Sequence, residues 1–272
     1  MRDAPLTPYE PLVDMCRESL RAVVGEGPYG GLLASYVAGG KMLRPLLAFV
    51  ACDAVGSQPS SAMHAAEAIQ LIHAASLVHD DLIDEAAVRR GRPALHRELG
   101  AEVALVLGDR LLAQAFVRMS SVAETVGTAV ASRCVSLLGE HTIRCCDGQL
   151  HELEDASSGD YVAVARGKTA SQFVAAAVLG GILGGATEND AALLTAYADA
   201  LGVAFQVQDD LRDGARVPPD VAPDAHLARA LAALAGLRWS RGRFALETLA
   251  RVALTLPEPA RAAIVPSSGA RR

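Results

Sequence analysis

Lysine is almost absent from this 272-residue chain: of 25 basic residues, only Lys41 and Lys168 are lysine, and the others are arginine. Lysine carries a compact ammonium group, whereas arginine carries a planar fork of donors, so the two residues bind anions differently. Because arginine fills nearly every other basic position, the two lysines are candidates for a specific role.

Other scarcities exclude whole classes of protein. The formal net charge of −6 argues against a nucleic-acid partner, which requires a basic face. The five cysteines form no C-x-x-C pair and no metal-ligand spacing, so we expect buried free thiols in a reducing compartment. No stretch of about 18 residues is apolar enough to span a membrane, and acids and prolines stand where a signal peptide needs an apolar run. We therefore expect a soluble cytoplasmic protein with no transmembrane segment.

Alanine and leucine are abundant, and apolar residues recur at helical spacing almost throughout the chain. Alternating β-branched runs are scarce, which disfavours strands. The pattern predicts an all-α, single-domain fold over residues 1–272, with a disordered tail at 265–272. The expected helices cover 8–24, 31–38, 44–56, 61–87, 101–121, 124–139, 141–155, 158–184, 188–213, 225–251 and 257–265.

Two acidic clusters share the pattern D-D-x-x-D. They are DDLID, with Asp80, Asp81 and Asp84, and DDLRD, with Asp209, Asp210 and Asp213. On a helix, the first and last aspartates of each cluster lie on one face, where like charges repel. Both helices are otherwise apolar, so a cation must offset the repulsion. A hard divalent ion fits, because Mg²⁺ is held by a few carboxylates together with phosphate oxygens and water. A solvated acidic face would explain one such cluster better than two.

Cationic residues accompany the acidic clusters. Lys41 and Arg44 lie in GGKMLRP, Arg89 and Arg90 follow the first cluster, and Lys168 lies in GKTASQF. Lysine and arginine side chains are the usual partners of phosphate oxygens. His73 lies two helical turns before Asp80 and Gln206 one turn before Asp210, so both are further candidates, although a histidine on an apolar helix is more often a core residue.

In these motifs the chain resembles the trans-type isoprenyl diphosphate synthases (polyprenyl synthetases). The likeness covers roughly residues 30–213 and includes GGKMLRP, LIHAASLVHDDLIDEAAVRRGRP, LGDRLLAQAF, DGQL, GKTA and FQVQDDLRD in the family's order. It implies a helical bundle around a central cavity and a homodimer. It also implies head-to-tail condensation of an allylic diphosphate with isopentenyl diphosphate, with Mg²⁺ as cofactor.

The resemblance assigns roles to the motif residues. The metal and the allylic diphosphate would be bound by Asp80, Asp81, Asp84, Asp209, Asp210 and Asp213. The same diphosphate would be held by Arg89, Lys168 and Gln206, and isopentenyl diphosphate by Lys41, Arg44, His73 and Arg90. Ala75 and Ser76 precede the first cluster, where bulky residues block chain growth in this family. Because both are small, we expect a product longer than C15, with geranylgeranyl diphosphate favoured.

The segment after the second cluster departs from the family pattern. The stretch GARVPPDVAPD has no lysine where the family has a glycine- and lysine-containing segment, and Ala94 replaces a usual threonine. Two alternatives therefore stay open: a class I terpene cyclase on the same fold, and a catalytically weak regulatory subunit. Aromatic residues make up 4% of the chain, which disfavours a cyclase that stabilises cations with aromatic faces. The complete acidic clusters disfavour a silent subunit.

Overall fold

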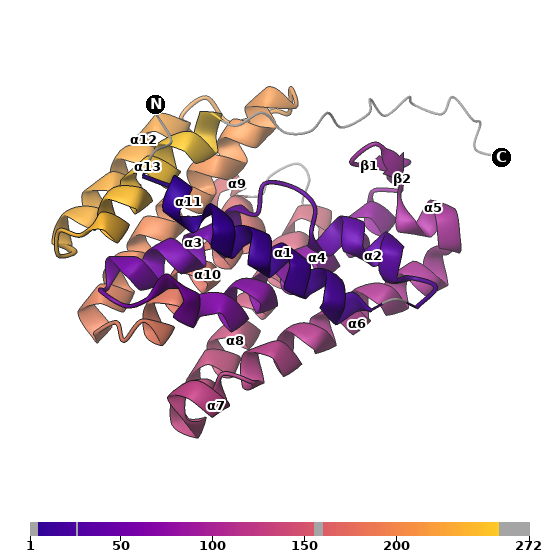
Figure 1. Cartoon of the computed structure of the whole chain (residues 1–272). Coiled ribbons are helices and arrows are strands. Elements are labelled where there is room, and N and C mark those ends of the chain that lie inside the picture. Colours follow the sequence, from indigo (N-terminus) through magenta and orange to yellow (C-terminus); the bar gives the residue numbers. More distant parts are fainter. Residues whose placement is uncertain (1–4, 26, 155–159, 256–272) are drawn as a thin grey trace.

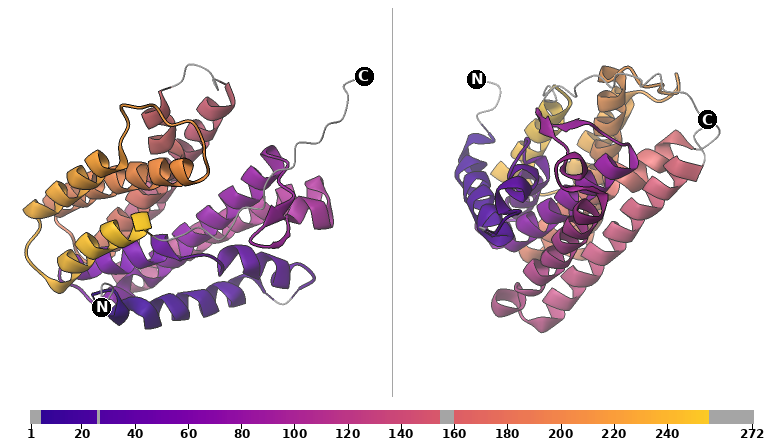
Figure 2. Two further views of the ribbon diagram at one scale, coloured as in Figure 1. Left: turned by 90° about the horizontal axis from the view of Figure 1, so that it is seen from above. Right: turned by 90° about the vertical axis from the view of Figure 1, so that its right-hand side faces the viewer.

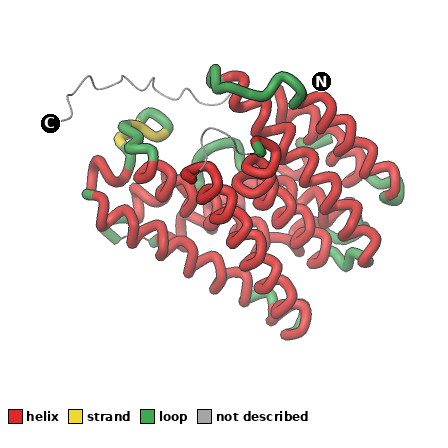
Figure 3. Tube along the Cα trace, turned by 180° about the vertical axis from the view of Figure 1, so that it is seen from behind, coloured by secondary structure: helices red, strands yellow, loops and turns green. Residues whose placement is uncertain are grey.

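The structure, a computed structural model, describes residues 5–25, 27–154 and 160–255. Helices dominate this part of the chain (Figure 3), as the apolar periodicity predicts. The first half contains α1 (Glu10–Val24), α2 (Gly30–Val37), α3 (Leu43–Ala54), α4 (Met63–Ile83), α5 (Leu95–Leu99), α6 (Ala101–Ser120) and α7 (Ala123–Val126), with the short 3₁₀ turns η1 (Thr7–Tyr9) and η2 (Pro59–Ala62). The second half contains α8 (Thr128–Glu154), α9 (Tyr161–Ala165), the π-helical turn η3 (Arg166–Ala170), α10 (Ser171–Leu183), α11 (Glu188–Arg212), α12 (Pro223–Ala233), the 3₁₀ turn η4 (Leu234–Gly236) and α13 (Arg241–Thr255).

Helices α4 and α10 form the centre of the bundle (Figure 1). Both carry apolar residues on nearly every face, and both are buried over most of their length, as expected for helices surrounded by other helices. Helix α4 packs against α3, α6 and α10, and α10 packs against α3, α8 and α11. The acidic clusters close α4 and α11, so this packing also positions the candidate site.

A small β-hairpin interrupts the helical chain. Strands β1 (Val88–Arg89) and β2 (Arg92–Pro93) pair antiparallel, with Arg89 opposite Arg92. The hairpin and α5 lie at one end of the molecule, and α12 and α13 lie at the other (Figure 2). None of the helices in the described ranges is both long and apolar enough to cross a membrane.

Three predicted helix boundaries are wrong. Helix α4 ends at Ile83 instead of 87, because the chain turns there into the hairpin. The expected break near residue 140 does not exist: α8 runs through Gly139, and the break lies at Gly127, whose φ is 82°. The predicted helix 225–251 is divided, because the chain leaves the helix at η4 and Ser240 then accepts a hydrogen bond from the Arg243 amide at the start of α13.

The cysteine prediction is confirmed in part. All five thiols are free, and four are buried, whereas Cys146 is exposed on α8. The predicted helix 257–265 and the tail 265–272 lie outside the described residues.

Candidate active site

The first acidic cluster lies at the carboxyl end of α4, where the helix closes in a tight turn. Asp84 is the C-cap, and the Ala86 amide donates to the Asp81 carbonyl at 2.9 Å. Asp81 is only 1% exposed. Its carboxylate accepts a hydrogen bond from the Tyr36 hydroxyl at 2.7 Å and one from Arg89 Nε at 2.9 Å. Asp81 is therefore held by protein donors, while Asp80 is partly buried and Asp84 is exposed.

Arg90 connects the hairpin to the glycine motif. Its guanidinium donates to the Ser35 carbonyl at 2.8 Å. A Cβ atom on Gly39 would lie 2.3 Å from one Arg90 nitrogen, and a Cβ atom on Gly40 would lie 2.7 Å from another. The absence of a Cβ atom at these two glycines therefore leaves room for the Arg90 guanidinium. Arg90 itself has φ of 50°, a strained conformation for a side-chain-bearing residue that is typical of functional sites.

The predicted isopentenyl diphosphate residues form one cationic group. Burial lowers the pKa of His73 well below its usual range, and the neighbouring guanidinium groups of Arg44, Arg90 and Arg89 lower it further. His73 is therefore neutral at pH 7 and can accept or donate a hydrogen bond without adding charge.

Lys41 and Arg44 lie over an aromatic pair. Lys41 Nζ is 5.9 Å from the centroid of the Phe205 ring, and Arg44 Cζ is 5.0 Å from that of Phe173. The two ring centroids are 5.4 Å apart. These cation–π contacts orient both cations between α3, α10 and α11.

The turn η3 connects the two acidic clusters. Lys168 Nζ donates to Glu152 Oε2 of α8 at 2.5 Å. Burial lowers the pKa of Lys168, but Asp80, Glu152 and Asp84 outweigh it, so the pKa is raised and the ammonium group stays charged. Thr169, the next residue, donates to Gln206 Oε1 at 2.5 Å. Adjacent residues of one turn thus interact with the first cluster and with α11.

The second cluster lies at the carboxyl end of α11. Gln206 Nε2 donates to Asp210 Oδ1 at 2.8 Å, and the Tyr161 hydroxyl donates to Asp210 Oδ2. Asp213 is the C-cap, and the Ala215 amide donates to the Asp210 carbonyl at 2.9 Å. The predicted residues Gln206 and Asp210 are therefore in direct contact.

The donor set fits a hard divalent ion, although the carboxylates do not form a complete metal site by themselves. Within the described ranges, no three His, Cys, Asp or Glu side chains converge as a metal-binding group. Mg²⁺ is usually held by one or two carboxylates and completed by substrate phosphate and water, so an incomplete protein set is consistent with it. Burial raises the pKa of Asp80, while Lys168 opposes this shift, so binding of a cation there would relieve a buried charge.

The two chain-length candidates differ in exposure. Ala75 is fully buried, and Ser76 is partly buried with its hydroxyl donating to the His73 carbonyl at 2.9 Å. The buried Gln172 amide of α10 donates to Ser76 Oγ at 3.4 Å. Ser76 is therefore the better placed of the two to touch a substrate tail.

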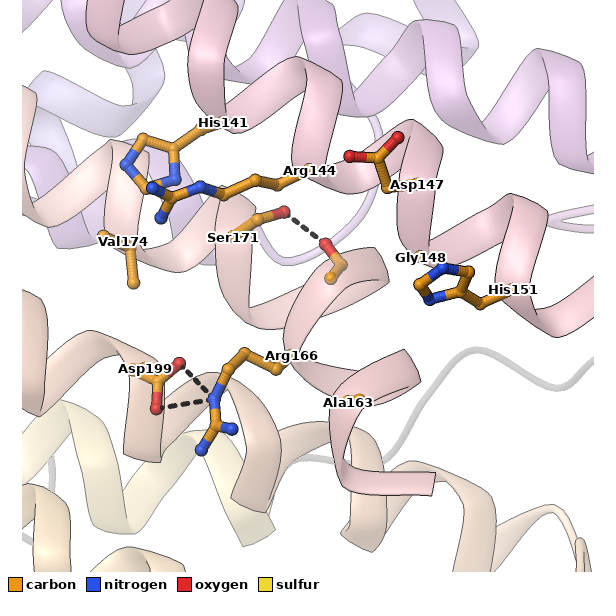
Figure 4. Close-up of a pocket in the computed structure, with 11 residues that line it drawn as sticks. His141, Arg144, Asp147, Gly148, His151, Ala163, Arg166, Ser171, Val174 and Asp199 are labelled. Carbon is orange, nitrogen blue, oxygen red and sulfur yellow. Dashed lines mark hydrogen bonds and ion pairs between the residues drawn. The ribbon is translucent and has the colours of Figure 1, made fainter. Parts of the chain in front are cut away.

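A separate pocket of about 370 Å³ lies behind η3, between α8 and the α9–α11 side (Figure 4). Its lining includes His141 and Arg144 of α8, and across the gap the Arg166–Asp199 ion pair, with Nε–Oδ1 at 2.9 Å. No residue predicted from the sequence lines this pocket, so it does not belong to the candidate active site.

The sequence reasoning missed Tyr36, Tyr161 and Glu152. No motif marked the two tyrosines, because a single tyrosine on a helix is unremarkable until the fold places it against an aspartate. Glu152 stands one turn after Gly148 of the DGQL segment, and only its contact with Lys168 identifies it.

The family model described as Polyprenyl synthetase matches residues 29–220, a range that contains every predicted site residue from Lys41 to Asp213. The chain belongs to the polyprenyl synthetase family.

Curated relatives match about two thirds of this chain. Geranylgeranyl pyrophosphate synthase 11, chloroplastic, of Arabidopsis thaliana is 41% identical over 193 residues, which cover 66% of this chain and 54% of that protein. The chain spans about half the length of the curated relatives it matches.

Solved structures share the fold. The geranylgeranyl pyrophosphate synthetase of the archaeon Geoglobus acetivorans has a TM-score of 0.79 and 26% identity, with 89% of this chain and 97% of that chain covered. A polyprenyl synthase of Caulobacter crescentus complexed with calcium and isoprenyl diphosphate has a TM-score of 0.79 and 24% identity, with 96% and 98% covered. These likenesses confirm the predicted all-helical fold.

Proposed function

We propose that this protein condenses an allylic diphosphate with isopentenyl diphosphate in a Mg²⁺-dependent reaction that yields a longer trans-prenyl diphosphate. The observation that carries the proposal is the placement of η3. Lys168 interacts electrostatically with Asp80 and Asp84 of the first cluster, and Thr169 donates to Gln206, which donates to Asp210 of the second. These contacts support a site in which both clusters and Lys168 bind one metal–diphosphate complex.

The allylic diphosphate lies between the two clusters. All six cluster aspartates would hold the metal. The outer ligands would be Asp80, Asp84, Asp209 and Asp213, and the carboxylates of Asp81 and Asp210 are also oriented by protein donors. Bound Mg²⁺ supplies charge neutralisation that assists departure of pyrophosphate. Arg89 is oriented by Asp81 through Nε, and a guanidinium has five N–H donors, so others are left to bind phosphate oxygens. Lys168 binds the same diphosphate as a point charge.

Isopentenyl diphosphate binds to Lys41, Arg44, His73 and Arg90. This places its double bond beside the allylic carbon, so that holding the two substrates in line lowers the barrier. Ionisation of the allylic C–O bond releases pyrophosphate and leaves an allylic cation. The double bond attacks the cation, and the proton lost afterwards passes to pyrophosphate, so no protein base is required. Exclusion of water protects the cation from quenching.

The reaction class is tested by incubating the purified protein with Mg²⁺ and geranyl, farnesyl or geranylgeranyl diphosphate, with and without labelled isopentenyl diphosphate. Label in longer diphosphates supports the proposal. Hydrocarbon formed without isopentenyl diphosphate would indicate a cyclase, and inactivity until a partner chain is added would indicate a regulatory subunit. The retained cationic group around His73 favours elongation, since a cyclase has no use for an isopentenyl site.

Geranylgeranyl diphosphate is the favoured product, because Ala75 and Ser76, which precede the first cluster, are both small. Replacing Ser76 by Phe should shorten the product by at least one C5 unit, because the ring would occupy the path of the growing tail. Product length is measured by chromatography after phosphatase treatment, with Ser76→Ala as the matched control. An unchanged product from Ser76→Phe would contradict the assignment.

A second copy of the chain is the proposed partner. Helices α6 and α8 pack against each other and carry large apolar side chains that are more than half exposed: Leu105, Val106 and Val117 on α6, and Ile143, Leu150 and Leu153 on α8. Such a surface is typical of an interface between subunits. Light scattering should show a dimer, and Val117→Asp with Ile143→Asp should give a monomer. A monomeric wild type would contradict this.

A further inference from the structure

Tyr161 holds a carboxylate of the second cluster, a contact that no sequence motif marks. Its hydroxyl donates to Asp210 Oδ2, and Gln206 Nε2 donates to the other oxygen, Oδ1, at 2.8 Å. Gln206 is fixed in turn by Thr169 at 2.5 Å. Three elements, α9, η3 and α11, thus join in one chain of hydrogen bonds that ends on Asp210.

The ring of Tyr161 stands on its own small apolar cluster. Buried Ala170, Val203 and Val207 form the base of this cluster, and Tyr161, Val162, Val217 and Val221 pack against it. Val217 and Val221 belong to the segment after the second acidic cluster, which departs from the family pattern. That segment therefore covers the base on which Tyr161 rests.

The start of α9 is fixed as well. The Asp160 side chain accepts hydrogen bonds from the amides of Val162 at 3.0 Å and Ala163 at 3.2 Å, an N-cap that sets where the helix begins. A phenol is protonated at neutral pH, so the Tyr161 hydroxyl is a donor.

These contacts are compatible with a bound metal. Each carboxylate oxygen has two lone-pair sites, so a hydrogen bond from Tyr161 or Gln206 leaves capacity on the same atom. Carboxylates near metals are commonly oriented by hydrogen bonds from residues that do not touch the ion.

We propose that Tyr161 is a positioning residue: it fixes the Asp210 carboxylate, and through it the Gln206 amide, in the orientation that the Mg²⁺–diphosphate complex needs. The inference rests on the proposed function and adds to it, because it extends the site to α9. It also gives the divergent segment a place in the site, since Val217 and Val221 pack against the same apolar base as Tyr161.

The experiment replaces Tyr161 by Phe, which removes only the hydroxyl. Binding of Mg²⁺ is measured by calorimetry and by thermal shift at fixed inorganic pyrophosphate, independently of turnover. The Mg²⁺ concentration for half-saturation should rise roughly threefold to tenfold, because one hydrogen bond to a charged group is lost while Gln206 remains. The matched control is Tyr197→Phe, whose hydroxyl donates to the Leu246 carbonyl at 2.8 Å in the core, far along α11 from the cluster. That variant should lose stability and keep the wild-type half-saturation.

Half-saturation within twofold of the wild type in Tyr161→Phe would overturn the inference, as would an equal rise in Tyr197→Phe. The proposed function is judged separately. If the wild type binds Mg²⁺ and pyrophosphate but does not extend an allylic diphosphate, the proposed reaction is wrong, and the binding comparison still decides the role of Tyr161. If the wild type binds neither, both the reaction and the inference fail.

Discussion

The two acidic clusters are built alike in their backbones and differently in their surroundings. In each, the fifth residue of the motif, Asp84 or Asp213, is the C-cap of the helix. The amide two residues later donates to the carbonyl of the second aspartate at 2.9 Å. This pattern of hydrogen bonds is a Schellman C-cap. The closing residue has positive φ in both clusters: 50° at Glu85 and 72° at Gly214.

The side chains also follow a common plan. The second aspartate of each cluster is held by a tyrosine hydroxyl from a different helix and by one further donor. For Asp81 the donors are Tyr36 and Arg89, and for Asp210 they are Tyr161 and Gln206. The difference lies in charge: the first cluster is paired with a guanidinium, the second with a neutral amide. Arg89 is therefore held at the first cluster by Asp81, whereas Gln206 joins Asp210 to η3 through Thr169.

The largest expected effect comes from removing one cluster's outer ligand. Asp80→Ala should lower kcat/KM for the allylic substrate by at least about a thousandfold, because Asp80 also interacts with Lys168 and Arg89. Asp209→Ala should lower the same kcat/KM by about a hundredfold. Steady-state kinetics measures both. Glu124→Ala, exposed on α7, is the control and should retain full activity. Undiminished activity in Asp80→Ala would refute its metal role, and equal losses would refute the ranking.

Lys168 is expected to be next in size, because it interacts with Asp80 and Asp84 of the first cluster and its neighbour Thr169 donates to Gln206. Lys168→Met should lower kcat/KM for the allylic substrate by about a hundredfold, since a charge-assisted contact with a departing diphosphate is lost. The matched control is Arg133→Gln. It removes an exposed cation near the start of α8, where Arg133 is paired with Glu188 of α11. A variant with wild-type kinetics would remove η3 from the mechanism.

Acid should destabilise the fold through His73, which lies on α4 two helical turns before the first cluster. The folded-state pKa of His73 is lowered by burial and by three arginines, so the unfolded chain binds a proton that the folded protein does not. The free energy of unfolding should therefore fall as pH drops below about 6.5, the ordinary value for histidine. Urea denaturation at pH 7.5 and 5.5 measures this loss.

The variant that tests the cause is His73→Gln, which should show a smaller loss of stability between the two pH values. His151→Gln, on the exposed face of α8, should keep the wild-type loss. If all three proteins lose stability equally, His73 is not the source of the acid sensitivity.

The smallest expected effects concern the two C-caps. Gly214→Ala should lower the free energy of unfolding by about 1 kcal/mol, because a side chain is strained at positive φ. Glu85→Gly should change it by no more than about 1 kcal/mol in the stabilising direction, since relief of strain is offset by the entropy of an unfolded glycine. Urea denaturation of both variants decides the comparison. A loss in Glu85→Gly would show that its side chain makes a stabilising contact.

The fold could be predicted from apolar periodicity, and the candidate site from motif spacing, but only as far as local pattern extends. The ends of α1 and α11 fall within a residue or two of the prediction, because caps and breaks there coincide with the apolar pattern. The sequence pattern predicts a break at residue 140, whereas α8 runs through it, because local pattern does not show how neighbouring helices pack on a long helix. The hairpin after Asp84 was missed because two-residue strands have no periodicity to detect.

Within the candidate site, the sequence identified the charged residues and not their supports. Arg89 was assigned to phosphate, and the structure adds that Asp81 orients it. Tyr36 and Tyr161 could not be found, because each meets its aspartate only through the fold, at separations of 45 and 49 residues. The sequence shows which side chains are charged, whereas the orientation of each aspartate depends on which helices pack beside it.

The π-helical turn has a consequence for how this chain can vary. A π turn holds one residue more than the α-helical turn it replaces, so everything on its amino-terminal side is rotated by about 100° relative to an uninterrupted helix. Deleting a single residue between 166 and 170 would restore ideal helical winding and rotate Tyr161 away from Asp210. Related sequences that keep this tyrosine should therefore conserve the length of that stretch, even where its amino acids differ.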